Sequence, residues 1–267
     1  MIIHKPKGKE SETVVVMHDF HLNLASQFST RWGNDEFATP DPRFILNYMA
    51  RNHDLGWQEF DRNPGIDPET GWPYNVVTVP PGDAALIHRQ NVARNYAFHP
   101  YAGILSAMHI TGFFNSRRGM CEFVTINDYV EKYPEYVTPL VAECEANIER
   151  WIAEVGASPE TLEWVDTDRL WTNYRLLQTF DMLSLYFCLG YDEQIALTNV
   201  PVANGNSTTI TIEPLGDGHH RIDPYPFRLA PLPVLLDAKQ VKQPIGDPVE
   251  AMLVSPTVQL EYVVQPS

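Results

Sequence analysis

The spacing of apolar residues changes near residue 199, and this change restricts the folds that the chain can adopt. Before it, apolar side chains recur three or four residues apart, which is typical of amphipathic helices; Ile45, Met49 and His53 follow one another in this way. After it, segments 209–212 and 258–262 alternate apolar and polar residues, which is typical of strands. We therefore expect a helical body followed by a β-rich part.

The same patterns assign individual segments. Residues 1–4, a polar turn and the β-branched run 13–16 predict an N-terminal β-hairpin. Pro and Gly are frequent over residues 56–82, which predicts a long loop, and loops of that length are often functional. Apolar residues at helical spacing predict one helix that follows Pro42 and includes His53, and further helices over 18–32, 83–96, 101–114, 126–155 and 166–189.

Together these elements predict a mainly α protein with two parts. Residues 1–198 are expected to form a helical bundle that carries the N-terminal hairpin. Residues 199–267 are expected to form a small C-terminal β-rich subdomain packed on the bundle. A chain of 267 residues is long enough for one large domain with such an extension.

The composition limits the cellular compartments and the classes of binding partner that we expect for this chain. Hydrophobic residues make up 44% of the chain and charged residues 20%, as in a packed globular protein. The 34 Asp and Glu against 19 Lys and Arg leave no extended basic surface for nucleic acid. Three cysteines without CxxC spacing, and no signal peptide or membrane-spanning run, predict a soluble cytoplasmic protein that is compatible with a homo-oligomer.

Two His-Asp dipeptides occur, His18-Asp19 and His53-Asp54, and the second has the more informative setting. His53 lies near the end of a predicted helix, on its apolar face. Burying an imidazole beside a carboxylate is costly unless the two are paired or coordinated. A divalent cation removes that cost, because both groups are good ligands. His53 and Asp54 are therefore candidate metal ligands.

Two further residues are suited to the same site. His21 lies one helix earlier in the sequence, and Asp181 lies in a late helix among large apolar residues such as Phe180 and Leu183. A carboxylate in such a position either binds a metal or accepts hydrogen bonds from a backbone amide or from Arg175. The residues by themselves leave both interpretations open.

These residues fall within stretches that together resemble a known family. The stretches are 18–21, 31–33, 53–57 followed by Asp61 and Pro64, 100–109, 181–185 and 223–227. They resemble the uncharacterised bacterial family DUF3891, and the order His, His-Asp, Asp resembles the HD superfamily of metal-dependent phosphohydrolases. The resemblance implies an HD-domain-like helical bundle in which a divalent transition metal (Fe, Mn, Zn or Ni) is bound by His21, His53, Asp54 and Asp181.

The resemblance also implies roles for residues between the His-Asp pair and the last Asp. Dinuclear HD proteins have two further histidines in this interval, which here are His88 and His109. His109 is a candidate metal ligand or substrate contact, whereas His88 is either a ligand of a second metal or a surface residue. The site thus holds one ion or two, with Asp54 and His109 as candidate catalytic residues.

Three more residues are candidates for supporting roles. His18 lies one helical turn from His21, and Asp61 follows the His-Asp pair and is suited to orienting a ligand histidine. Arg117 follows the helix of His109 and is suited to binding an anionic group of a substrate.

We expect hydrolysis of a small phosphorylated substrate at the metal site. One alternative is a di-iron oxygenase, which needs all six ligands His21, His53, Asp54, His88, His109 and Asp181. The other is a non-catalytic protein that binds a metal or a small ligand. Phosphate-binding loops, the dinucleotide-binding glycine motif, the GxSxG nucleophile motif and HExxH are all absent from the sequence.

Overall fold

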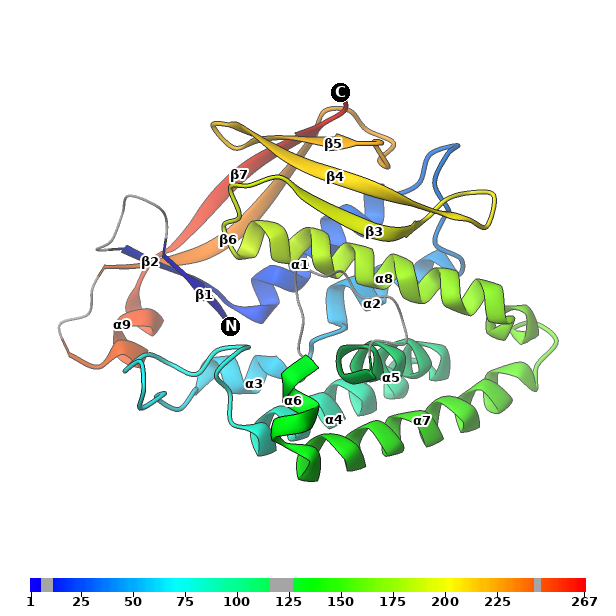
Figure 1. The fold of residues 1–267 in the computed structure, drawn as a ribbon, viewed down its shortest axis with the longest axis horizontal. Helices are drawn as coiled ribbons and strands as arrows, with labels where there is room; N and C mark the ends of the chain where they lie inside the picture. Colours follow the sequence, from blue (N-terminus) through cyan, green and yellow to red (C-terminus); the bar gives the residue numbers. More distant parts are fainter. Residues whose placement is uncertain (6–11, 116–126, 243–245) are drawn as a thin grey trace.

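The computed structural model describes residues 1–5, 12–115, 127–242 and 246–267, which form a helical region beneath a curled sheet (Figure 1). The helices are α1 (His18–Arg31), α2 (Arg43–Asn52), α3 (Trp57–Arg62), α4 (Pro81–Phe98), α5 (Pro100–Asn115), α6 (Asn127–Lys132), α7 (Pro134–Gly156), the 3-10 helix η1 (Leu162–Val165), α8 (Thr167–Cys188) and α9 (Pro248–Val254). The strands are β1 (Ile2–His4), β2 (Glu12–Val16), β3 (Ile195–Pro201), β4 (Ser207–Gly216), β5 (His219–Asp223), β6 (Leu232–Lys242) and β7 (Thr257–Gln265).

All of these strands belong to one mixed sheet with the order β1-β2-β6-β7-β5-β4-β3. Neighbouring strands are antiparallel except β5 and β7, which run parallel. The N-terminal hairpin joins the C-terminal strands because β2 pairs with β6, with Glu12 opposite Lys242. Strands from both ends of the chain therefore build a single sheet.

This sheet corrects the expected fold class. Helices account for 50% of the structure and a curled, half-barrel sheet for 23%, so the prediction of a mainly α, HD-domain-like bundle with a small β-rich subdomain is wrong. The prediction failed because period-two patterns identify strands one at a time. They do not report that two strands more than 200 residues apart share a ladder of hydrogen bonds.

Most of the local predictions are confirmed. The hairpin strands and the helices α1, α2, α4, α5 and α8 lie within a few residues of the predicted ranges. The predicted loop 56–82 is wrong in its first part, which forms α3. The predicted helix 126–155 is divided into α6 and α7, because Pro134 begins a new helix and has no amide hydrogen to continue the previous one.

Helix α8 lies between two hydrophobic clusters. On one side, its Phe180 and Phe187 pack with Phe28 of α1, with Trp32 directly after α1 and with the inner face of the sheet. On the other side, its Tyr174 and Leu177 join a cluster built from α2, α4, α5 and α7. Fifteen of the 22 residues of α8 are buried, as expected for a helix surrounded by other elements. The helix thus connects the sheet to the remaining helices.

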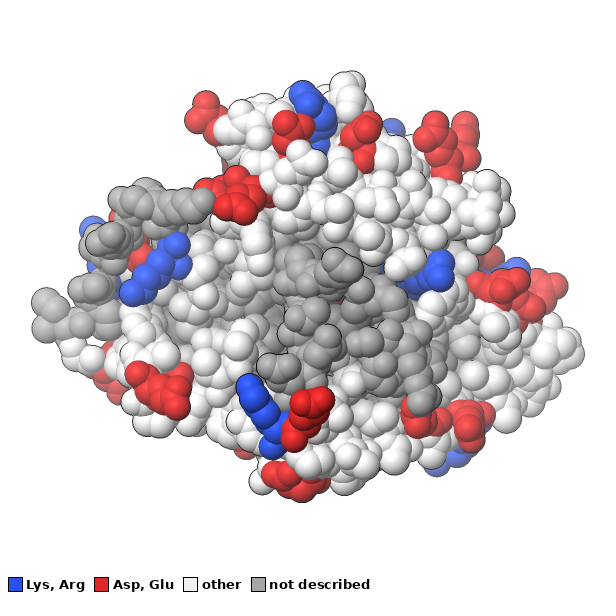
Figure 2. Space-filling view, in the orientation of Figure 1, with Lys and Arg blue, Asp and Glu red and all other residues white. Residues whose placement is uncertain are grey.

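Charged side chains lie mainly near the outline of the face shown in Figure 2, where acidic groups are prominent. This distribution accords with the net charge of -15. Among the described helices, none has both the length and the apolar character needed to cross a membrane.

The core between α1, α8 and the sheet makes a testable contribution to stability. Phe28 is fully buried there, whereas Phe44 on α2 is 57% exposed. Replacing Phe28 by Ala should lower the free energy of unfolding by about 3–5 kcal/mol, because it removes apolar contacts and leaves a cavity. Phe44→Ala is the matched control and should cost much less. Urea unfolding followed by circular dichroism measures both, and equal losses would contradict this description of the core.

Candidate metal centre

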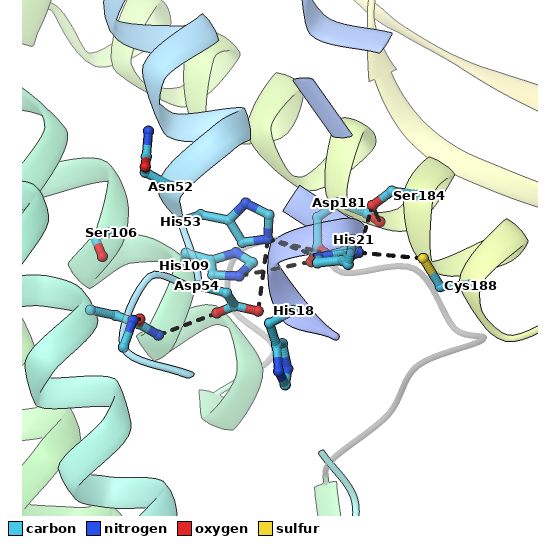
Figure 3. Close-up of polar contacts among 12 residues, drawn as sticks. His18, His21, Asn52, His53, Asp54, Ser106, His109, Asp181, Ser184 and Cys188 are labelled. Atoms are coloured by element: carbon cyan, nitrogen blue, oxygen red, sulfur yellow. Dashed lines mark hydrogen bonds and ion pairs between the residues drawn. The ribbon is translucent and has the colours of Figure 1, made fainter. Parts of the chain in front are cut away.

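Five side chains of metal-ligand type meet in the interior (Figure 3). They come from α1, the end of α2, α5 and α8, and all are buried: His21, His53, Asp54, His109 and Asp181. Together they offer three imidazoles and two carboxylates. Nitrogen and oxygen donors of this kind suit a divalent transition metal.

Three of these residues form the tightest group around one carboxylate oxygen. Oδ1 of Asp181 lies 3.1 Å from Nε2 of His21 and 3.3 Å from Nε2 of His53. The two Nε2 atoms are themselves 3.3 Å apart. All three ligand atoms therefore point to one small volume, which is the arrangement that a bound ion requires.

A second group shares His53 with the first and adds Asp54 and His109. Nε2 of His53 is 3.8 Å from Oδ2 of Asp54, and Nε2 of His109 is 3.8 Å from Oδ2 of Asp181. Nε2 of His109 is buried and has no hydrogen-bond partner in the described part of the chain. A buried nitrogen without a partner is costly unless it binds something, so this atom also fits a metal ligand.

The His-Asp turn is held in place by polar side chains of α4. Asn91 accepts a hydrogen bond from the amide of Gly56 and donates one of 3.2 Å to Oδ1 of Asp54. Asn95 donates to the carbonyl of Asn52 at 3.2 Å. These bonds fix the backbone of the turn and Oδ1 of Asp54. The other carboxylate oxygen, Oδ2, faces His53.

Ser184 orients His21 from the opposite side. Its Oγ lies 2.9 Å from Nδ1 of His21 and 2.9 Å from the backbone carbonyl of Asp181. A hydroxyl has one hydrogen, so if it donates to the carbonyl, it accepts from Nδ1–H of His21. Nε2 of His21 then carries the lone pair that faces the centre.

The charges within the centre are strongly coupled. Burial disfavours a charged His53, but the hydrogen bond to Asp181 and the charges of Asp54 and Asp181 outweigh it and raise the pKa of His53 to about 9. Burial likewise opposes ionisation of Asp181, yet the contact with His21 and the hydrogen bond from His53 hold its pKa well below the usual range. Burial lowers the pKa of His109 to about 4, so His109 is neutral at pH 7, as a metal ligand must be.

His18 and Asp61 lie next to the centre and contact each other. Nδ1 of His18 is 3.1 Å from both carboxylate oxygens of Asp61, and the amino group of Met1 lies 2.5 Å from one of them. Asp61 therefore contacts His18 rather than one of the five clustered residues. The His18 ring stacks on Trp57, and its Nε2 has no hydrogen-bond partner among the described residues.

The remaining predicted residues lie elsewhere. His88 on α4 is half-buried and belongs to neither ligand group, although burial lowers its pKa to about 4. Arg117 lies outside the described residues. The structure thus brings together His21, His53, Asp54, His109 and Asp181, with His18 and Asp61 beside them.

Sequence reasoning missed Asn91, Asn95 and Ser184. The two asparagines are four residues apart in a predicted helix, and both prove to be fully buried. Buried asparagines must find hydrogen-bond partners, so a pair on one helical face was a usable signal. Ser184 follows Asp181 by three residues and hence shares its side of α8.

A cavity of about 400 Å³ adjoins the centre. His21, Asp54 and Asp181 reach its wall, together with His18 and His88. The side chain of Asp54 is 13% exposed, compared with 3% or less for His21, His53, His109 and Asp181. Asp54 is therefore the member of the cluster most accessible to a molecule in the cavity.

The chain was compared with known proteins. The model of a family described as "Protein of unknown function (DUF3891)" matches residues 1–243. No curated protein and no solved structure matches the chain.

Close packing at Gly56 provides a test of the turn. A Cβ atom at this position would lie 2.4 Å from the backbone carbonyl oxygen of Ile87 and 2.7 Å from Oδ1 of Asn91. Gly56→Ala should therefore push α3 away from α4 and lower the melting temperature. Gly71→Ala, in open space but at a positive φ of 70°, is a control for backbone strain without a clash. A smaller decrease in melting temperature for Gly56→Ala than for Gly71→Ala would contradict the close packing of Gly56 against α4.

The raised pKa of His53 predicts a specific pH dependence for protein treated with a chelator. Its folded-state pKa of about 9 exceeds the ordinary histidine pKa of 6.5, so the protonated side chain stabilises the fold fully below pH 6.5. This contribution is lost as the pH rises through 9. Urea unfolding should give a lower free energy of unfolding at pH 9 than at pH 6.5 for the wild type. The decrease should be smaller for His53→Gln. An equal loss in the two proteins would show that His53 does not carry the effect.

Proposed function

We propose that this chain, which belongs to the DUF3891 family, is a metal-dependent hydrolase that acts on a small phosphorylated substrate. The observation that carries the proposal is the convergence of five buried His and Asp side chains beside a cavity. A buried group of two carboxylates and three imidazoles is hard to explain by packing alone, since each charge would need a partner.

The donor set supports one ion and leaves room for a second. His21, His53, Asp54 and Asp181 would bind the first ion, in the order His, His-Asp, Asp that resembles the HD superfamily. His109, whose buried Nε2 has no partner in the described part of the chain, would hold a second ion together with the carboxylates of Asp54 and Asp181, because the single lone pair of His53 Nε2 can serve only one ion at a time. Imidazole and carboxylate ligands suit Fe, Mn, Zn or Ni.

When bound, such an ion would polarise a phosphoryl oxygen and lower the pKa of a coordinated water. The protein side chains would supply orientation. Asp54, which faces the cavity and is held by Asn91, would accept a hydrogen bond from the attacking water. His18 lines the same cavity, and its Nε2, which has no hydrogen-bond partner in the part of the chain that the structure describes, would contact the substrate. Ser184 would keep His21 in position through its contact with Nδ1, the ring nitrogen that faces away from the centre.

The metal and the activity can be tested together. Protein purified without chelator should contain one or two transition-metal ions per chain by elemental analysis. His53→Ala should remove most of this metal and lower the hydrolysis of p-nitrophenyl phosphate at least about 100-fold, because it deletes a residue shared by both ligand groups.

His219→Ala is the matched control, because His219 is exposed on β5 and belongs to neither ligand group. It should retain metal and activity. Two irons per chain with oxygen consumption and no phosphoester cleavage would favour the di-iron oxygenase instead. Wild-type protein that binds no metal under any condition would exclude both enzymes and leave a ligand-binding role.

A further inference from the structure

We infer that the ligand of this site has an apolar body with one polar head group, such as an alkyl or aryl phosphoester. A sugar phosphate or a nucleotide fits the cavity poorly. The phosphate part of this inference rests on the proposed function, whereas the apolar body follows from the cavity alone.

Large apolar side chains form most of the cavity wall. They come from β1, α3, α5, α8 and the residue that follows α8, and they include Ile2, Trp57, Phe113, Phe114, Leu185 and Leu189. The volume of about 400 Å³ lies within the range of about 300–1,000 Å³ that is usual for small-molecule sites. The wall is therefore suited to removing an aliphatic chain or an aromatic ring from water.

The apolar lining continues to the opening of the cavity. Val76 and Val77 line the cavity and are also exposed, Val77 to 79%. Val79 and Ala84 are buried and line it further in. A ligand that enters here meets apolar surface from the opening inward.

Few polar side chains line the cavity among the described residues, and the two carboxylates among them, Asp54 and Asp181, belong to the metal centre. In the described part of the chain, the cavity wall contains Asp54, Asp181 and three histidines but no Lys, Arg, Ser, Thr, Asn or Gln. Outside the histidines, Tyr129 adds one hydroxyl, which is buried and without a described partner. A ligand with several hydroxyl groups would exchange its hydrogen bonds with water for contacts with carbon, and this loss is unfavourable.

The charge of the wall supports the same conclusion. A phosphate distant from the centre would find no described Lys or Arg to pair with. Among the described residues of the wall, a phosphate at the centre would find no cation other than the bound ions. One anionic group at the metal end, attached to an uncharged apolar body, is the ligand that this arrangement accommodates.

The inference can be tested with n-alkylphosphonates from methyl to decyl, which resemble phosphoesters but resist hydrolysis. Isothermal titration with metal-loaded wild-type protein should show the affinity rising about threefold to fourfold for each added methylene until the cavity is filled. Affinity that does not depend on chain length would overturn the inference, as would tighter binding of ribose 5-phosphate than of decylphosphonate.

A pair of variants tests whether the alkyl chain of the ligand lies within this cavity. Ala84→Phe should fill the space beside α4 and weaken decylphosphonate at least tenfold while leaving methylphosphonate little changed. Leu86→Phe, at an exposed position on the same helix outside the cavity wall, should leave both unchanged. Equal affinities of the two folded variants for decylphosphonate would show that the alkyl chain binds elsewhere. If Ala84→Phe does not fold, the chain-length series on the wild type decides the question.

Failure of the inference is distinguishable from failure of the proposed function. Decanol has no phosphorus and should bind even to chelator-treated protein. If decanol binds but the protein has no hydrolase activity, the apolar ligand is supported and the proposed hydrolase function is rejected. Cleavage of p-nitrophenyl phosphate with no dependence on chain length would uphold the hydrolase and reject the apolar ligand.

Discussion

The rest of the structure depends on Asp181, a carboxylate buried in a helix that is surrounded by apolar residues. Such a group is unfavourable unless positive or polar partners reach it. His21 and His53 lie 3.1 and 3.3 Å from its Oδ1, and His109 lies 3.8 Å from Oδ2. These partners lie on α1, at the end of α2 and on α5. The contacts of one carboxylate therefore hold three other elements against α8.

Hydrophobic packing makes this convergence rigid. Phe180 and Leu177 lie close to Asp181 in sequence but belong to different clusters, one shared with the sheet and one with the other helices. The ligands are therefore carried by elements packed on both sides, which favours a preorganised site. Asn91 extends the same principle, since it fixes Asp54, the clustered side chain that is most exposed to the cavity.

The sequence predicted the site better than the fold. Helical spacing placed His53 on a buried face, and the structure brings it together with His21, Asp54 and Asp181; the role of these residues as ligands stays a prediction. Each prediction needed only local periodicity or a resemblance between short stretches. The sheet needed the pairing of β2 with β6, a long-range contact that leaves no local pattern. The contacts of Asn91 and Ser184 were missed for a related reason, since their partners lie on other elements or across a helical turn.

The cavity and the centre together constrain how an anion is bound. Histidines that bind a metal do so in the neutral form, so Asp54 and Asp181 would contribute the two negative charges of a metal-loaded centre. One divalent ion would make the centre neutral, whereas two would leave it with a charge of about +2. The cavity wall supplies no described Lys or Arg to change this balance. A phosphomonoester dianion would thus be attracted by the two-ion centre and only weakly by the one-ion centre. In the proposed hydrolase, a second ion held with the help of His109 would therefore decide how strongly the site attracts a phosphorylated substrate.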